Sequence, residues 1–306
     1  MIETKNLTRK FGDLVAVDNL TLRVEDGEVF GFLGPNGAGK TTTVRMLCCL
    51  ISKTSGEGRV GDYEIGDSSS SMKIRRSIGY VPDNVGLYES LTAYENLDFY
   101  GKLYQTPEPQ RGQNIQRLLK LLDLWDKKDV ASGSFSKGMK QKLAIARSLV
   151  HDPEILFMDE PTANLDPEAS KTVREFILDL KKQKKTIFLN THNLDEAQRI
   201  CDRIAILNTR LMALGTPAEL EQSSGQRKTV IQLDKINDAI LDSLRKLSLG
   251  SLESDNNKLI IDVADPEKDN PVIVRAIVNA GGNIQYVSPS TSTLEEAYLK
   301  LVREKK

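Results

Sequence analysis

Short apolar runs alternate with amphipathic runs along the first two thirds of the chain. Four of the apolar runs are followed by turns or by helical patterns, and we interpret them as strands: residues 27–34, 154–160, 185–191 and 203–208. Runs of this length with few polar positions are typical of parallel strands buried on both faces. The pattern therefore predicts an α/β domain whose largely parallel sheet is covered by helices.

The segment between the first two of these strands, about residues 84–150, has mainly helical patterning. Thr92 and Glu95 have the spacing of a capping box, and the apolar residues of 115–125 have the pattern of an amphipathic helix. We predict a helical subdomain within the α/β domain.

A polar stretch with Ser-Ser-Gly interrupts the pattern near residue 224 and predicts a domain boundary. We expect domains at 1–222 and 229–306, joined by a linker at 223–228. The second domain has a strand–helix–strand–strand–helix–strand order, which is that of a ferredoxin-like α+β unit, followed by one more helix. The expected elements are 229–233, 236–247, 250–254, 258–263, 271–281, 283–288 and 293–306.

Composition and charge support an ordinary globular protein. The 306 residues are 39% hydrophobic, and 42 basic against 43 acidic residues give a formal net charge of −1. Without a bulk excess of positive charge, we expect no nucleic-acid partner.

No stretch approaches the roughly 18 to 20 apolar residues that a membrane-spanning helix requires, and the first residues lack the apolar core of a signal peptide. Cys48, Cys49 and Cys201 fit neither a disulfide framework nor a zinc site, because the number is odd and two are adjacent. We expect a cytoplasmic protein with buried, reduced cysteines.

In the stretch GPNGAGKT, four residues separate Gly34 from Gly39-Lys40-Thr41, and the stretch follows an apolar strand and precedes a helix. Glycines let backbone N–H groups surround phosphates, Lys40 adds positive charge, and the Thr41 hydroxyl can ligate Mg²⁺. A glycine-rich turn without function is the alternative. The predicted triphosphate-binding loop comprises Gly34, Asn36, Gly37, Ala38, Gly39, Lys40, Thr41 and Thr42.

The run ILFMDE ends in Asp159 and Glu160. Charge at the end of a buried strand is costly unless it serves a cation or a proton transfer. Because adjacent strand residues point to opposite faces, we expect Asp159 to face Mg²⁺ beside Thr41 and Glu160 to act as general base on the attacking water. An ordinary strand end with exposed acids is the alternative.

The stretch FSKGMKQ precedes a helical pattern. The Ser136 hydroxyl and the Gly138 amide at a helix N-terminus can form an anion site. The plain alternative is that Ser136 only caps the helix. On its own, the motif does not explain why one chain has two phosphate sites.

In order, the phosphate loop, FSKGMKQ, ILFMDE, PTANLD at 161–166 and NTH at 190–192 resemble the motif set of the ATP-binding cassette (ABC) ATPase domain, over about residues 1–220. The resemblance implies ATP and Mg²⁺ as cofactors and a head-to-tail dimer. Ser136 and Gly138 would contact ATP held by a second subunit, residues 164–166 would form the dimer-crossing loop, and His192 would hold the γ-phosphate.

Three further positions follow from the same resemblance. Phe11 stands where the family places an aromatic side chain on adenine, with Val17 beside it, although a lone Phe is more often a core residue. Asp83 stands where a metal-reaching glutamine is usual, and we expect it to bind Mg²⁺, directly or through water. Lys137 replaces a common glycine.

The variant FSKGMKQ and the C-terminal TLEEAYLKL are similar to drug-resistance ATPases of the daunorubicin type. This resemblance implies an exporter subunit that dimerises, as a homodimer, and docks through residues 85–104 on a separate transmembrane permease at the inner face of the membrane. We expect about half of the Tyr and Leu side chains of that segment to belong instead to the core of the helical subdomain.

Two other classes were weighed against the exporter. A single-cassette soluble ABC ATPase acting in assembly or on nucleic acid or ribosomes stays open, but such proteins generally carry tandem cassettes, a coiled-coil insertion, zinc cysteines or a basic face. A P-loop kinase or GTPase would lack the FSKGMKQ motif.

Overall fold

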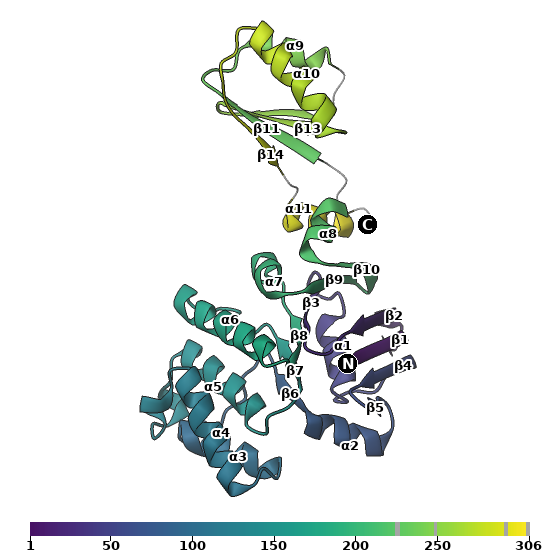
Figure 1. The fold of residues 1–306 in the computed structure, drawn as a ribbon. Coiled ribbons are helices and arrows are strands. Elements are labelled where there is room, and N and C mark those ends of the chain that lie inside the picture. The colour runs from purple at the N-terminus through teal and green to yellow at the C-terminus, as the bar shows by residue number, and fades with distance from the viewer. Residues whose placement is uncertain (224–226, 248–249, 291–292, 304–306) are drawn as a thin grey trace. The chain divides into compact units, whose positions relative to one another are not determined.

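The computed structural model describes residues 1–223, 227–247, 250–290 and 293–303 (Figure 1). The chain divides into two compact units, Met1–Pro217 and Ala218–Lys306. The division falls five residues before the expected boundary at 222, and residues 224–226 of the expected linker lie outside the described residues. The ends of that linker stay a prediction.

The first unit contains a six-stranded sheet in the order β10-β9-β3-β8-β7-β6. Its strands run parallel except for the edge strand β10, which is antiparallel to β9. Every residue of β3, β7 and β8 is buried, which explains their continuous apolar sequence and confirms the predicted largely parallel sheet. The bounds are β3 Val29–Leu33, β6 Ile78–Val81, β7 Ile155–Asp159, β8 Thr186–Asn190, β9 Arg203–Asn208 and β10 Arg210–Gly215.

Helices connect and cover these strands: α1 Lys40–Leu47, α2 Ser68–Ser77, α6 Pro167–Lys182 and α7 Leu194–Ile200. Among the described residues, no helix has both the length and the hydropathy needed to cross a bilayer.

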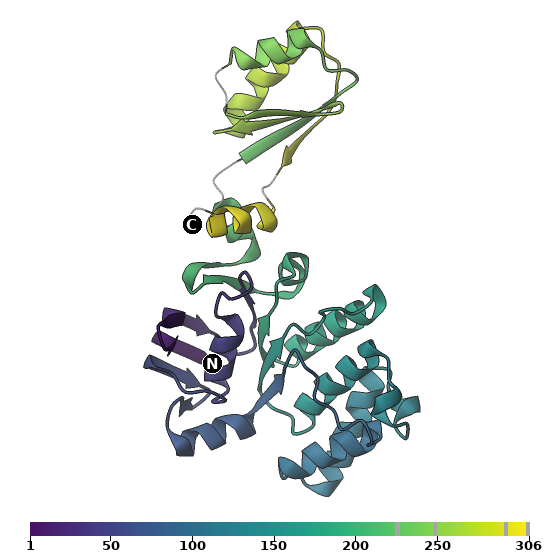
Figure 2. The same cartoon turned by 180° about the vertical axis from the view of Figure 1, so that it is seen from behind.

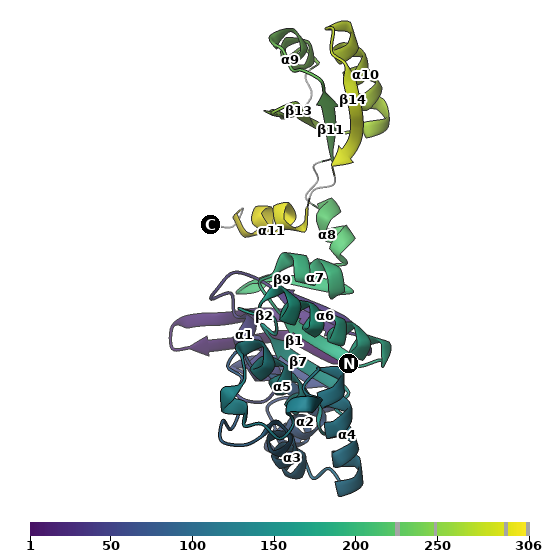
Figure 3. The same ribbon diagram turned by 90° about the vertical axis from the view of Figure 1, so that its left-hand side faces the viewer.

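A second, antiparallel sheet that the sequence analysis did not predict packs against the first. Its order is β2-β1-β4-β5, with β1 Ile2–Phe11, β2 Leu14–Val24, β4 Ser55–Val60 and β5 Tyr63–Glu64. The β1–β2 hairpin projects at one side of the unit (Figure 3). One face of the sheet is polar, so its strands carry alternating rather than continuous apolar residues.

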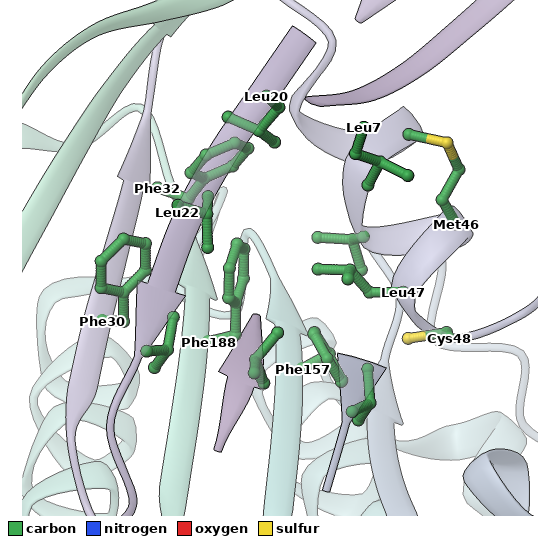
Figure 4. Packing of buried hydrophobic residues seen from close by; sticks show 14 of the residues in the cluster. Leu7, Leu20, Leu22, Phe30, Phe32, Met46, Leu47, Cys48, Phe157 and Phe188 are labelled. Carbon is green, nitrogen blue, oxygen red and sulfur yellow. The ribbon is translucent and has the colours of Figure 1, made fainter. Parts of the chain in front are cut away.

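Buried side chains of the two sheets form one core (Figure 4). The Phe188 ring lies at its centre, with centroid distances of 5.5 Å to Phe30, 5.1 Å to Phe32 and 5.5 Å to Phe157. Leu7, Leu20 and Leu22 of the antiparallel sheet belong to the same cluster. The core therefore fixes the ends of β3, β7 and β8 relative to the β1–β2 hairpin.

The predicted helical subdomain consists of α3 Ala93–Leu103, α4 Glu108–Leu121 and α5 Lys137–Leu149, with 3₁₀ turns at Trp125–Lys127 and Ser132–Ser134. These helices lie on the opposite side of the unit from β1, β2 and β4 (Figures 1 and 2). The capping box of Thr92 and Glu95 is confirmed. The helix expected at 115–125 instead spans Glu108–Leu121, since Asp123 has a φ of 55° and reverses the chain.

The second unit begins with α8 Pro217–Ser223, whose first residue closes the first unit, and contains a sheet in the order β12-β13-β11-β14 with all neighbours antiparallel. This order, with α9 and α10 on one face (Figure 1), confirms the predicted ferredoxin-like unit. The bounds are β11 Arg227–Leu233, α9 Asp238–Arg245, β12 Leu252–Asp255, β13 Lys258–Val263, α10 Pro266–Asn279, β14 Ile284–Ser290 and α11 Leu294–Arg303.

Helix α10 begins five residues before its predicted start at 271. Asp265 caps it by accepting a hydrogen bond from the Glu267 amide, and Pro271 lies inside the helix. Proline is typical of a first turn, which is why the sequence pattern placed the start at Pro271. The last three residues of the predicted final helix, 304–306, lie outside the described residues.

Candidate nucleotide-binding and catalytic site

A cavity of about 420 Å³ opens where β3, β7 and β8 end. Ligand sites of open α/β sheets lie at the carboxyl ends of their strands, and this cavity has that position. It brings together most of the residues predicted from the sequence. Its lining comprises Phe11, Leu14, Ala16, Asn36, Gly37, Ala38, Gly39, Lys40, Thr41, Thr42, Asp83, Asp159, Glu160 and Asn190.

The loop between β3 and α1 has a backbone that glycine alone accommodates. Gly39 has a φ of 96°, and a Cβ placed on it would lie 2.2 Å from the Ala16 carbonyl oxygen. A Cβ on Gly34 would lie 2.2 Å from the Leu207 carbonyl oxygen, so Gly34 supports the loop although it is not among the residues lining the cavity. The loop thus leads the α1 N-terminus, with its unpaired N–H groups, to the cavity.

Lys40 is 7% exposed and interacts with its own loop. Its Nζ donates to the carbonyl oxygens of Gly34 at 2.7 Å and Pro35 at 3.2 Å. Burial lowers the pKa of Lys40, while the carboxylates of Glu160 and Asp159 act in the opposite direction. A phosphate that replaced the two carbonyl contacts would supply a full countercharge to this ammonium group.

We expect Lys40→Ala to weaken ATP binding by about 10- to 100-fold, the value of one or two charge-assisted hydrogen bonds. Equilibrium titration with a fluorescent ATP analogue measures this loss. Lys171→Ala is the matched control, because Lys171 is 70% exposed on α6 and pairs only weakly with Glu175. Equal affinity of the Lys40 variant and the control would contradict a phosphate contact.

The oxygen atoms beside Thr41 fit a magnesium ion. Asp159 is 2% exposed, Asn190 donates to its Oδ1, and its Oδ2 has no hydrogen-bond partner among the described residues. Burial raises the pKa of Asp159, whereas the Thr41 hydroxyl and Asn190 lower it. An orphaned carboxylate oxygen beside a hydroxyl matches the preference of Mg²⁺ for oxygen ligands.

No group of three or more His, Cys, Asp and Glu side chains in the described part of the chain could hold a metal ion by itself. This agrees with the usual Mg²⁺ site of nucleotide-binding proteins, in which one or two protein oxygens act together with water and phosphate.

Glu160 lies just beyond β7 and has a φ of 52°. Its amide donates to the Asn190 carbonyl oxygen at 2.8 Å, and its Oε1 lies 2.8 Å from His192 Nδ1. The predicted alternation between Asp159 and Glu160 was wrong in its geometry: the left-handed backbone takes Glu160 out of the strand, so both carboxylates line one cavity. The acid and the histidine are nevertheless adjacent.

Ser136 and Gly138 lie away from this cavity. The Ser136 hydroxyl accepts a hydrogen bond from the Met139 amide at 3.3 Å and caps α5. Gly138 packs against α6, where an added Cβ would lie 3.0 Å from Ala169 Cβ. Neither residue is among those lining the cavity that contains Lys40.

A second cavity, of about 460 Å³, lies between α5 and Glu160. Lys137, Lys140 and Gln141 of α5 line it together with Asp83, Glu160 and Asn164. Lys137 and Asp83, the two departures from the family pattern, thus border the same space.

Phe11 and Val17 have different positions. Phe11 ends β1, is 45% exposed, lines the 420 Å³ cavity and carries the Arg9 guanidinium 4.3 Å from its ring centroid. Val17 is fully buried and packs beneath Gly39. We had expected it to contact the nucleotide, but it is not among the residues that line the cavity. The sequence analysis missed Leu14, Ala16 and Asn190. Asn190 could have been found, since it begins the NTH motif.

Comparison with known proteins agrees with this geometry. The family model described as ABC transporter matches residues 17–163. The linearmycin resistance ATP-binding protein LnrL of Bacillus subtilis (strain 168) is 36% identical over 251 residues, covering 81% of this chain and 80% of LnrL. The Nod factor export ATP-binding protein I of Rhizobium sp. (strain N33) is 36% identical over 302 residues, covering 98% of this chain and 96% of that protein.

A solved structure is similar in the first unit. The dimeric post-hydrolysis state of the ATP-binding cassette MJ0796, bound to ADP and Pi, has a TM-score of 0.65 and 28% identity, covering 71% of this chain and 98% of that one. The chain therefore belongs to the ABC transporter family, as an ATP-binding and ATP-hydrolysing subunit of an ABC export transporter.

Proposed function

We propose that two copies of this chain bind two ATP molecules between them and that each catalytic site is completed by the opposite copy. One observation carries this proposal. The 420 Å³ cavity gathers Phe11, the phosphate loop, Asp159 and Glu160, but its lining does not include Ser136 and Gly138, which the family resemblance assigns to ATP held by a second subunit. A second copy placed head to tail supplies those two residues.

The residues then divide the chemistry of hydrolysis. The loop amides and Lys40 hold the phosphates, and the Phe11 ring offers adenine an exposed apolar face. Glu160 accepts a proton from the attacking water, while His192, hydrogen-bonded to it at 2.8 Å, contacts the γ-phosphate. Asp159, Thr41 and Asp83 would hold Mg²⁺, which would neutralise charge on the phosphate oxygens.

ATP-driven closure of the dimer is proposed to move a separate transmembrane permease, which would place this chain at the cytoplasmic face of the membrane. Within the predicted docking segment 85–104, Tyr88, Phe99 and Leu103 are 47%, 38% and 60% exposed, whereas Ala93 and Leu97 are fully buried. Exposed aromatic and aliphatic side chains support an interface role for part of the segment. The other part is the core of the helical subdomain. We propose no nucleic-acid partner.

Affinity purification from detergent-solubilised membranes tests the permease. The bait is full-length Glu160→Gln with ATP and Mg²⁺, and Lys40→Ala is the matched bait, which we expect to bind ATP more weakly and therefore to form less of the ATP-bound dimer. We expect an integral membrane protein in stoichiometric amount with the first bait. Recovery of only soluble proteins or RNA would contradict the exporter and favour a soluble assembly ATPase.

We expect Asp83→Gln to change the Mg²⁺ dependence of ATP turnover more than ATP affinity. Asp83 lines both cavities, and its Oδ1 accepts a hydrogen bond from the Asn84 amide at 2.8 Å. Glutamine removes a charged oxygen that attracts the metal but leaves the phosphate loop intact. Turnover measured against Mg²⁺ at saturating ATP should require several-fold more metal. An unchanged metal titration would contradict the role of Asp83.

A further inference from the structure

A buried carboxyl group on α7 joins the two segments that carry Glu160 and His192. Glu196 is 1% exposed, and its Oε2 accepts hydrogen bonds from the Thr162 hydroxyl at 2.9 Å and the Thr191 hydroxyl at 3.2 Å. Thr162 follows Glu160 by two positions, and Thr191 directly precedes His192. One oxygen atom therefore connects the segment of the general base to the segment of the histidine.

Two further hydrogen bonds close the turn that leads into α7. The Thr191 hydroxyl oxygen accepts a hydrogen bond from the Asn193 amide at 3.1 Å, and the Asn193 side chain accepts one from the Glu196 amide at 3.0 Å. The turn from Thr191 to Glu196 is thus held at both ends. His192 lies within it, with a side chain that is 65% exposed.

The two threonines are 9% and 1% exposed, so loss of the carboxyl would leave two hydroxyl groups without an acceptor away from water. Burial raises the pKa of Glu196, while the two threonine hydroxyls and the nearby charge of Arg174 lower it. Its Oε1 has no hydrogen-bond partner within the described ranges. The two segments are therefore joined by hydrogen bonds to Oε2 of Glu196, which does not need a negative charge to accept them.

We propose that Glu196 is a positioning residue for ATP hydrolysis, which holds the Thr191–His192 turn against the segment after Glu160. Without it the two threonines are free to separate, and the 2.8 Å contact between His192 and Glu160 is no longer enforced. This inference rests on the proposed catalytic roles of Glu160 and His192. Glu196 is not among the residues that line the 420 Å³ cavity, so it acts on the chemical step and not on ATP binding.

The test compares Glu196→Ala with Glu196→Gln in the full-length protein. Misplacing a catalytic group by about 1 Å costs on the order of 100-fold in rate, so we expect kcat of Glu196→Ala to fall by about 10- to 100-fold with KM for ATP unchanged. The amide oxygen of glutamine can accept both threonine hydrogen bonds. We therefore expect Glu196→Gln to retain kcat to within about threefold.

Thr162→Val and Thr191→Val remove one donor each with little change in shape, and they provide the test if Glu196→Ala does not fold. Each should lower kcat several-fold. The Thr191 hydroxyl also accepts a hydrogen bond from the Asn193 amide, whereas the Thr162 hydroxyl donates to the Glu196 carboxyl. We therefore expect Thr162→Val to cause no further loss when it is combined with Glu196→Ala.

Glu28→Ala is the matched control for the removal of a buried carboxyl. Glu28 is 7% exposed, burial raises its pKa, and it accepts a hydrogen bond from the Glu25 amide beside the start of β3, at the opposite strand ends from the cavity. We expect this variant to lower the unfolding temperature while kcat of the folded protein stays within about twofold.

The proposal is overturned if kcat of Glu196→Ala equals that of the wild type, if KM rises while kcat is kept, or if Glu196→Gln is as impaired as the alanine variant. Additive losses in the double variant would also overturn it. Glu160→Gln and His192→Ala are measured in parallel. If they hydrolyse ATP normally, the proposed catalytic roles fail; if they are inactive while Glu196→Ala is active, only the positioning role fails.

Discussion

Glu160→Gln is expected to lower ATP hydrolysis by about 100- to 10,000-fold, the contribution of a positioned general base, while ATP binding is kept. Glutamine has nearly the shape of glutamate and can keep a contact with His192, but it cannot take a proton from water. Since hydrolysis is what ends the ATP-bound state, the variant should accumulate as an ATP-loaded dimer.

Phosphate release and size-exclusion chromatography with multi-angle light scattering measure the two effects on one sample. Glu154→Gln is the matched control, because Glu154 directly precedes β7 and lies at the other end of the strand from Glu160. Hydrolysis at the wild-type rate by Glu160→Gln would remove this residue from the catalytic machinery. A monomeric variant at saturating ATP would instead contradict nucleotide-driven dimerisation.

The parts of the candidate site whose placement agrees with the sequence pattern are those in which local backbone geometry and chemistry agree. The spacing of Gly34, Gly39 and Lys40 is dictated by a strand–loop–helix connection, and the structure shows that Cβ atoms at both glycines would collide with carbonyl oxygens. Asp159 ends a strand buried over its whole length, so its position at the sheet edge also follows from the pattern.

Contacts between distant segments could not be predicted in this way. The antiparallel sheet escaped notice because its apolar positions alternate with polar ones and pair across residues 2–64 rather than within one run. Val17 directly follows the cavity-lining residue Ala16, but its side chain faces the core. The direction of that side chain depends on the irregular pairing of β1 with β2. The φ of Glu160 is set by its hydrogen bond to Asn190, 30 residues away (190 − 160 = 30).

FSKGMKQ illustrates both limits. The helix cap that we had weighed as the plain alternative is present, because Ser136 does accept a hydrogen bond from Met139. The cap and a nucleotide contact are not exclusive, since a hydroxyl oxygen that accepts one bond still has an O–H to donate. The motif by itself did not place Ser136 and Gly138 relative to Lys40 and Glu160, and the structure shows that they are not among the residues lining the cavity of those two side chains.

Ser136→Arg is accordingly expected to leave ATP binding by the monomer unchanged and to abolish turnover. The side chain lies on the exposed start of α5, where arginine fits without disturbing the core, but its bulk would occupy the space that the opposite subunit's γ-phosphate needs. Titration with a fluorescent ATP analogue and steady-state hydrolysis separate the two effects. Ser134→Arg, two residues earlier in an exposed 3₁₀ turn, is the matched control.

Mixing Ser136→Arg with Lys40→Ala, at an ATP concentration too low for the Lys40 variant to bind, decides whether Ser136 acts across the dimer. A dimer of one Ser136→Arg chain and one Lys40→Ala chain contains one site with both defects and one with neither. Random pairing of equal amounts makes about half of the dimers mixed, so turnover should recover to about a quarter of the wild-type rate if the two sites work independently. If Ser136 instead served the ATP of its own chain, every site in the mixture would carry a defect and no activity would return.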